Sequence, residues 1–273
     1  VGNARGCLTA AIMEYRMIAP PSNPPPMVEV KNVSVRFNLV EAVKAVSFHV
    51  DSGNIFGLVG SDGAGKSTLL RLIATMIKPS DGEIYINGLN VLTDRRKIKN
   101  VIGYMPQRFG LYQDLTVEEN IDFFMDIFGI PRAERKSRKD KYLGFSNLLP
   151  FVDRLAGNLS GGMKQKLGLA CVLVHEPKVL ILDEPTNGVD PVSRREFWEI
   201  LGNMKQEGMT ILVSTAYLDE GEICDQVALM HRAIILESTT PEAMRANFSS
   251  LEEAIIARIN EVDKDLAHDT FQF

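Results

Sequence analysis

The nine residues from Gly60 to Thr68 constrain the fold of this chain more than any other stretch. They read Gly-Ser-Asp-Gly-Ala-Gly-Lys-Ser-Thr and fit G-x-x-x-x-G-K-[ST], the pattern of a phosphate-binding loop. An apolar segment, 55–59, precedes them, which predicts a strand. The apolar residues after the loop recur at helical spacing: Leu69, Leu72, Ile73 and Met76. The pattern therefore predicts a strand, a turn and a helix, with backbone N–H groups facing a phosphate chain.

Each residue type in the loop has a chemical reason to be there. The glycines let backbone N–H groups turn inward around phosphates, Lys66 reaches the outer phosphates, and the Ser67 hydroxyl binds Mg²⁺. The predicted nucleotide-binding residues of the loop are Gly60, Ser61, Asp62, Gly63, Ala64, Gly65, Lys66, Ser67 and Thr68.

Composition excludes several classes of protein. The 273 residues are 45% apolar and 24% charged, as in a globular protein with a full core, and the net charge of −5 argues against nucleic acid as a partner. No apolar run approaches the ~18 residues of a membrane span. The three cysteines, Cys7, Cys171 and Cys224, are far apart, which suits a reducing cytoplasm and predicts neither disulfides nor a zinc site.

Along the chain, residues 1–26 are rich in proline and predict a tail or linker, followed by a folded unit over 27–260 and a C-terminal tail over 261–273. Alternating strands precede the loop, and Asn87-Gly88 indicates a hairpin. Residues 108–175 have a helical pattern, and Thr116 with Glu119 predicts a capping box. The basic run 132–141 is interpreted as a solvated helix face, with contact to anionic lipid headgroups as the alternative.

Two later motifs belong to a phosphate site. Asp183 and Glu184 end the buried-type strand 179–182, where ligands of α/β sheets bind, so one carboxylate is expected to hold Mg²⁺ and the other to polarise water. A solvent-facing acidic turn is the alternative. Upstream, Ser160-Gly161-Gly162-Met163 begins a helical stripe and could be a simple N-cap or a second phosphate-binding helix start.

Taken in order, these motifs resemble the ATPase subunit, or nucleotide-binding domain, of an ABC transporter over roughly residues 27–260. The phosphate loop alone is common to a large superfamily, but its sequence with Gln107, Leu159-Ser160-Gly161-Gly162, Leu182-Asp183-Glu184-Pro185 and Asp190 is specific. Segments 102–107, 115–120 and 217–220 are similar to ABC-2 type exporters. The variants Asp62, Met163 and Ser214-Thr215-Ala216-Tyr217 look most like one ATPase unit of the tandem-ATPase members of that group. The resemblance implies an α/β fold: a P-loop NTPase core with a mixed β-sheet, an antiparallel β subdomain and a helical signature subdomain.

The resemblance also implies roles for single residues. Phe37 would stack on adenine, with an ordinary core position as the alternative, and Gln107 would touch Mg²⁺ and report to the transmembrane partner. Ser160, Gly161, Gly162 and Met163 would close on ATP held by a second ATPase domain, because the family works as a head-to-tail dimer, homomeric or heteromeric. Glu184 would be the base that orients water, with Lys66 and Gln107 as its catalytic partners. Asp190 would link the two sites, and Ser67, Gln107 and Asp183 would serve Mg²⁺.

Three positions depart from the family pattern. Asp62 replaces the usual Asn, and Met163 replaces the usual Gln of the signature. More seriously, Ala216 stands where the family has a His that donates to the γ-phosphate. Thr215, Tyr217 or a water would have to replace that donor, or the site would be slow.

The sequence thus predicts an ATP- and Mg²⁺-dependent ATPase that energises export through a separate ABC-2 type permease, on the inner face of the cell membrane. Two alternatives remain at this point. One is a nucleotide-gated regulatory module with little hydrolysis, which Ala216 favours and Glu184 opposes. The other is an ABC protein acting on ribosomes or DNA, which usually has two ATPase units.

Overall fold

A computed structural model describes residues 25–269. The larger of its two sheets corresponds to the predicted P-loop core with a mixed β-sheet. Most of the predicted tail, 1–24, lies outside the described residues with Cys7, as do residues 270–273. The strand order in the larger sheet is β10-β9-β3-β8-β7-β6. These strands are β3 (Ile55–Val59), β6 (Ile102–Met105), β7 (Val179–Asp183), β8 (Thr210–Thr215), β9 (Gln226–His231) and β10 (Ile234–Thr239). β10 pairs antiparallel with β9 and the others pair in parallel, which confirms a mixed sheet.

A smaller, four-stranded sheet forms the predicted antiparallel unit, in the order β2-β1-β4-β5. Its strands are β1 (Val28–Phe37), β2 (Val40–Val50), β4 (Asp81–Ile86) and β5 (Leu89–Asn90). The hairpin at Asn87-Gly88 is confirmed: both residues have positive φ, at 49° and 74°, and Ile86 pairs with Leu89. A two-residue turn with both φ values positive matches the twist of the flanking strands.

Two apolar cores flank the larger sheet. One lies between the two sheets around α1 (Lys66–Ile73), whose Leu69, Leu70, Leu72 and Ile73 are all buried there. The other covers the opposite face with residues from four helices: α3 (Val117–Ile127), α5 (Gly161–Leu173), α6 (Pro191–Gln206) and α8 (Leu251–Asp269). Every residue of β3, β7 and β8 is buried, which is why each of these strands contains a run of apolar residues.

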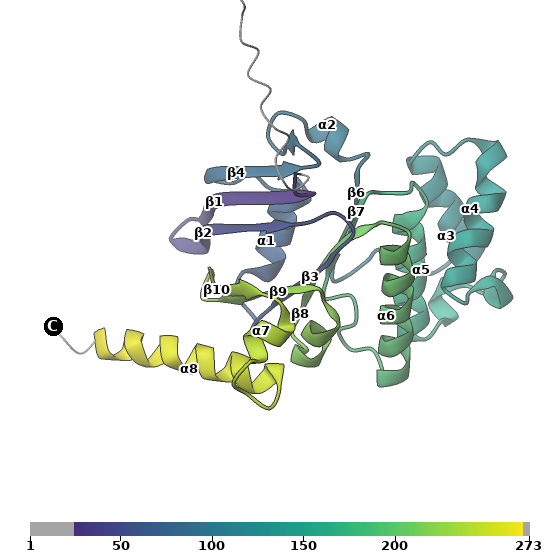
Figure 1. Cartoon of the computed structure of the whole chain (residues 1–273). Helices are drawn as coiled ribbons and strands as arrows, with labels where there is room; N and C mark the ends of the chain where they lie inside the picture. The colour runs from purple at the N-terminus through teal and green to yellow at the C-terminus, as the bar shows by residue number, and fades with distance from the viewer. Residues whose placement is uncertain (1–24, 270–273) are drawn as a thin grey trace, which may run out of the picture.

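The helical unit predicted over 108–175 lies at one end of the molecule, away from the antiparallel sheet (Figure 1). It contains α3 (Val117–Ile127), α4 (Arg132–Phe145), the 3₁₀ turns η1 (Leu149–Phe151) and η2 (Ala156–Asn158), and α5 (Gly161–Leu173). The capping box is confirmed, because Thr116 Oγ1 accepts from the Glu119 N–H and Glu119 accepts from the Thr116 N–H.

The basic run on α4 is paired with acidic side chains, so its interpretation as a solvated face was wrong in part. Lys139, only 19% exposed, contacts Glu118 at 2.6 Å and Asp122 at 3.2 Å on α3. Arg138, 17% exposed, pairs with Glu134 and donates to the Val174 carbonyl at the end of α5. These contacts tie α4 to the helices beside it, and a basic run in a sequence does not show where its counter-charges lie.

Other differences from the sequence concern where elements end. α1 ends at Ile73, so Met76, predicted on its buried stripe, is 62% exposed. β6, β10 and the short α2 (Arg95–Ile98) were not predicted, and the segment 217–224 forms a 3₁₀ helix, η3 (Leu218–Ile223). After α7 (Pro241–Arg245), α8 continues past residue 260, where a tail was expected, and Asp263 contacts His231 at 2.9 Å and Arg232 at 3.1 Å.

Over residues 25–269, the structure contains no helix with the length and apolar character needed to cross a membrane.

Two isoleucines on α3 give a test of the packing. Ile121 is fully buried and Ile127 is 60% exposed. Ile121→Ala should lower the free energy of unfolding by about 2–5 kcal/mol, because it leaves a cavity, whereas Ile127→Ala should change it by less than about 0.5 kcal/mol. Denaturant unfolding followed by circular dichroism measures both, and equal losses in the two variants would contradict the assigned faces of α3.

Candidate active site

The phosphate loop joins β3 to α1 and packs tightly against neighbouring backbone. A Cβ atom on Gly60, where φ is +150°, would lie 2.0 Å from the Met230 carbonyl oxygen on β9. On Gly65, where φ is +107°, it would lie 2.4 Å from the Ala42 carbonyl oxygen on β2. Close packing therefore requires glycine at both positions, in addition to the phosphate geometry argued from the sequence. No side chain caps the N-terminus of α1, and its first N–H groups are free of such a partner.

Lys66 lies at the base of this loop and is only 4% exposed. Its ammonium donates to the carbonyl oxygens of Gly60 at 2.8 Å and Ser61 at 3.1 Å, and lies 3.5 Å from Glu184 Oε1. A buried ammonium is stable only with such compensation, since leaving water costs several kcal/mol. The fold thereby brings Lys66 and Glu184, which are 118 positions apart in the sequence, into contact.

Asp183, at the end of β7, is fully buried. Its Oδ1 accepts from Ser67 Oγ at 2.7 Å and from Ser214 Oγ at 2.9 Å, whereas its Oδ2 has no hydrogen-bond partner. A buried carboxylate oxygen without a partner, beside a serine hydroxyl, has the chemistry of a hard-cation ligand set. The residues present therefore fit Mg²⁺. Within the described part of the chain no cluster of three or more His, Cys, Asp or Glu could hold a metal, so a cation here would need phosphate oxygens or water as further ligands.

Glu184 follows directly and is 8% exposed. Its φ is +48°, a left-handed conformation that costs a non-glycine residue of order 1–3 kcal/mol and that clusters at functional sites. Gln107 Nε2 donates to Glu184 Oε2 at 2.8 Å, and Asn187 Nδ2 donates to the same oxygen at 3.1 Å. The Glu184 N–H donates to Ser214 Oγ at 3.0 Å. The carboxylate is therefore held in one orientation, close to the phosphate loop.

Gln107 is thus placed in the site, but on Glu184. Its contact to Mg²⁺ stays a prediction, as does the contact of Phe37 to adenine. Phe37, at the end of β1, is 48% exposed, so an ordinary core position, the alternative for this residue, was wrong.

A pocket of about 420 Å³ opens above the loop. Its lining comes from the phosphate loop, from β2 and from the β9–β10 turn: Val40, Glu41, Ala42, Gly63, Gly65, Lys66, Ser67, Thr68, Glu184, Arg232 and Ala233. Sequence reasoning missed the contributions of β2 and of the β9–β10 turn. Arg232 and Ala233 both have positive φ, a conformation unusual for these residue types, so no turn pattern identified them.

The signature residues form a separate helix start. Ser160 is the N-cap of α5, and its Oγ accepts from the Met163 N–H at 3.3 Å. Gly162 packs on α6, where a Cβ atom would lie 2.5 Å from the Cβ of Ser193. None of Ser160, Gly161, Gly162 and Met163 lines the pocket of the phosphate loop. The N-cap interpretation is therefore correct within one chain, and a phosphate for this helix start would have to come from elsewhere.

Asp190 is the N-cap of α6. Its Oδ1 accepts from the N–H groups of Val192 at 3.1 Å and Ser193 at 3.0 Å at the start of α6. The Ser193 N–H holds the pKa of the Asp190 carboxyl below its usual range. The carboxylate therefore stays charged and keeps the first turn of α6 fixed.

Ala216 is exposed just after β8, and it lines a small cavity of about 10 Å³ together with Glu184, Thr186, Asn187, Thr215 and Tyr217. Thr215 does not offer a free donor there, because its hydroxyl donates to Glu220 and accepts from the Tyr217 N–H. The Tyr217 ring is engaged with Arg194, whose guanidinium carbon lies 4.0 Å from the ring centroid. The structure therefore gives no support to Thr215 as a replacement for the missing His.

Residues 43–187 match the protein family described as ABC transporter. The probable multidrug ABC transporter ATP-binding protein YbhF of Escherichia coli is 49% identical over 203 residues, which cover 74% of this chain and 35% of YbhF. The chain thus spans about a third of the length of that relative. The methionine import ATP-binding protein MetN 1 of Bacillus cereus is 38% identical over 231 residues, covering 81% of this chain and 67% of MetN 1.

A solved structure agrees with these matches. The ATP-binding cassette MJ0796, a dimer in a post-hydrolysis state bound to ADP and Pi, superposes with a TM-score of 0.71 at 25% identity, covering 78% of this chain and 98% of that one. The loop, the paired carboxylates and the two-sheet fold described above agree with the family found by these comparisons. The chain therefore belongs to the ABC transporter family and is an ATPase domain of that family.

Proposed function

We propose that this chain binds and hydrolyses Mg-ATP and energises export through a separate membrane-spanning partner. The observation that supports it best is the meeting of Lys66, Ser67, Asp183 and Glu184 at one edge of the larger sheet, around an oxygen of Asp183 that has no partner. A triphosphate would lie along the loop N–H groups, with Lys66 at its outer phosphates. Phe37, exposed at the rim of the antiparallel sheet, would stack on adenine.

Hydrolysis would depend on Glu184. Its carboxylate, held by Gln107 and Asn187, would accept a proton from the attacking water or orient it toward the γ-phosphate. Mg²⁺ held by Ser67 and Asp183, with Gln107 nearby, would neutralise the charge that develops on the phosphate oxygens. Lys66 would move from its contact with Glu184 to the phosphates, which would free the carboxylate for the water.

The site would be completed by a second ATPase domain arranged head to tail. The signature turn, residues 160–163, forms the N-terminus of α5, where backbone N–H groups can bind a phosphate. This turn lies outside the pocket formed by the phosphate loop of the same chain. The dimeric state of MJ0796 in its ADP and Pi complex supports this arrangement. Asp190, at the start of α6, would link the two composite sites, and the dimer would be homomeric or formed with a related domain.

The membrane partner is proposed to be a permease of the ABC-2 type, with this chain on the inner face of the cell membrane. The multidrug relative YbhF supports export, together with the sequence resemblance of segments 102–107 and 115–120 to that class. The importer MetN 1 is less similar, at 38% identity against 49%. A second candidate function is a nucleotide-gated module with little hydrolysis, which Ala216 favours.

Glu184→Gln tests the composite site. The variant should bind Mg-ATP but hydrolyse it slowly, and the ATP-bound dimer should therefore accumulate. Light scattering at saturating Mg-ATP is expected to report twice the monomer mass, while Glu199→Gln, at an exposed site on α6, should behave like the unaltered chain. A Glu184→Gln chain that stays monomeric would contradict a homodimer and would require a heteromeric partner.

Ala216→His tests whether the site is slow. A methyl group cannot donate to a phosphate oxygen, and one preorganised donor of this kind is typically worth ~3 kcal/mol, or roughly 10²–10³ in rate. The rate of single-turnover hydrolysis at equal ATP occupancy should increase by up to this factor in Ala216→His. It should stay unchanged in Ala216→Phe, which adds a ring without a donor. No gain from the histidine would refute the slow-site proposal.

A further inference from the structure

Glu220, in η3, is a buried carboxylate that the proposed chemistry does not use. It is 1% exposed and accepts three side-chain hydrogen bonds. Thr186 Oγ1 donates to its Oε1 at 2.8 Å, Thr215 Oγ1 donates to its Oε2 at 2.5 Å, and Arg194 Nε donates to Oε1 at 3.2 Å. A carboxylate so far from water is tolerated only with partners of this kind, and here all of them come from other elements or from the strand end before η3.

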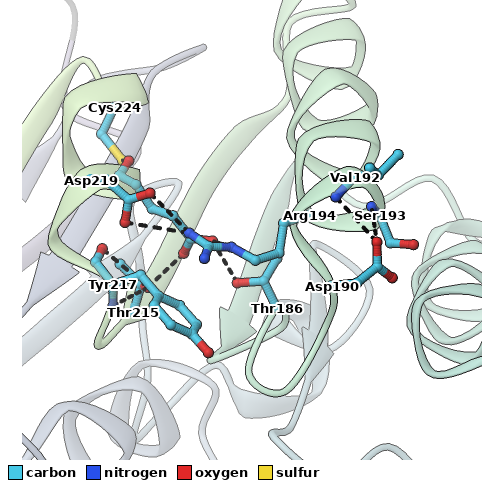
Figure 2. A network of polar contacts seen from close by, with 10 residues as sticks. Thr186, Asp190, Val192, Ser193, Arg194, Thr215, Tyr217, Asp219 and Cys224 are labelled. Carbon is cyan, nitrogen blue, oxygen red and sulfur yellow. Dashed lines mark hydrogen bonds and ion pairs between the residues drawn. The ribbon is translucent and has the colours of Figure 1, made fainter.

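The side chain of Arg194 is also fixed by several contacts, in addition to its hydrogen bond to Glu220. Figure 2 shows its side chain leaving α6 and reaching across to the segment that carries Thr215, Tyr217 and Asp219. Its terminal nitrogen lies 3.0 and 3.3 Å from the two oxygens of Asp219, and its guanidinium stacks on Tyr217 at 4.0 Å. A planar guanidinium with carboxylates at its edge and a ring on its face has one orientation, which a lysine could not reproduce.

Part of this network lies beside the proposed reaction centre: Thr186, Thr215 and Tyr217 line one small cavity together with Glu184. Thr186 stands two positions after Glu184, and Thr215 stands directly before Ala216. Arg194 follows Ser193, which receives the cap of Asp190 and packs on Gly162 of the signature turn. One continuous set of contacts therefore runs from the signature turn, through the first turn of α6, to the loop that carries Glu184.

We propose that Arg194 and Glu220 are positioning residues for ATP hydrolysis: they fix the Glu184 loop and the end of β8 to the first turn of α6. Through Ser193 and Gly162, a displacement of the signature turn would be carried to the catalytic carboxylate of the same chain. The link to the signature rests on the proposed function, in which that turn closes on the ATP of a partner. The positioning of Glu184 itself rests only on the contacts within this chain.

Stability alone does not account for the network. Buried ion pairs cost nearly as much desolvation as they return, and replacing one with apolar groups is often neutral or stabilising. The effect of such a network on the reaction rate can be larger, because a misplacement of about 1 Å at a reacting group can lower the rate about 10²-fold.

Arg194→Ala should lower kcat for ATP hydrolysis by about 10²-fold and change KM by less than about threefold, because the phosphate loop is untouched. Arg194→Lys, which keeps the charge but not the fork, should lower kcat by about tenfold. The matched control is Arg195→Ala, since Arg195 is the next residue, 79% exposed and 4.0 Å from its one carboxylate partner, Glu199. Its kinetics should equal those of the unaltered chain.

Arg194→Ala leaves Glu220 without its cation and lowers stability for that reason alone, so a double variant separates the two effects. In Arg194→Ala/Glu220→Gln the buried charge is gone, while the glutamine oxygen still accepts from one of the two threonine hydroxyls and its amide N–H₂ donates to the other. Thermal unfolding should recover toward that of the unaltered chain, and kcat should stay low. Recovery of kcat together with stability, or an increase in KM that matches the loss of kcat, would overturn the proposal.

Association measured on the same proteins keeps the two proposals apart. In a Glu184→Gln background, Arg194→Lys should still dimerise with Mg-ATP, because the signature and phosphate loops are intact. If the Glu184→Gln chain does not associate, the homodimer is contradicted, but the kcat and stability comparison still decides the role of Arg194.

Discussion

The parallel pairing of β3, β8 and β7 is the constraint on which the site depends. Val59 pairs with Thr215, and Asp183 pairs with Ser214, so the three strands end at the same level. Their carboxyl ends continue into the phosphate loop, the segment of Ala216, and Glu184. Residues from positions 60, 183 and 216 therefore meet at one edge of the sheet, as expected for ligand sites of α/β folds. A shift of one residue in this register would turn Asp183 away from Ser67.

Buried charged side chains are the second feature that determines the structure at this edge of the larger sheet. Lys66, Asp183 and Glu184 are all buried. Carbonyl oxygens of the phosphate loop accept from Lys66, a hydroxyl of α1 donates to Asp183, and the amide of Gln107 donates to Glu184. Glu220 and Arg194 form a further ion pair, which contacts the Glu184 loop through Thr186. The carboxylates of Asp183 and Glu184 are thus held in place before a nucleotide binds, and the rearrangement proposed at this edge is the move of Lys66 to the phosphates.

The sequence was enough for the features with a local cause. The phosphate loop, the Asn87-Gly88 turn and the Thr116 cap each follow from backbone geometry within a few residues, and the structure has all three. Features that depend on distant partners could not be predicted. The counter-charges of Lys139 on α3, the stacking of Arg194 on Tyr217, and the place of Arg232 beside the pocket all need the folded chain. Met76 was misplaced because periodicity does not indicate where a helix ends.

Calorimetric titration with Mg-ATP, on this chain and on Lys66→Ala, tests the central claim most directly. The account predicts that Lys66→Ala loses at least about tenfold in affinity, because a charge-assisted contact to phosphate is worth about 1.5–3 kcal/mol. Lys97→Ala, at a surface lysine that is 70% exposed, should bind as the unaltered chain does. Equal affinity in the unaltered chain and in a folded Lys66→Ala would contradict the assignment of this loop as the phosphate site.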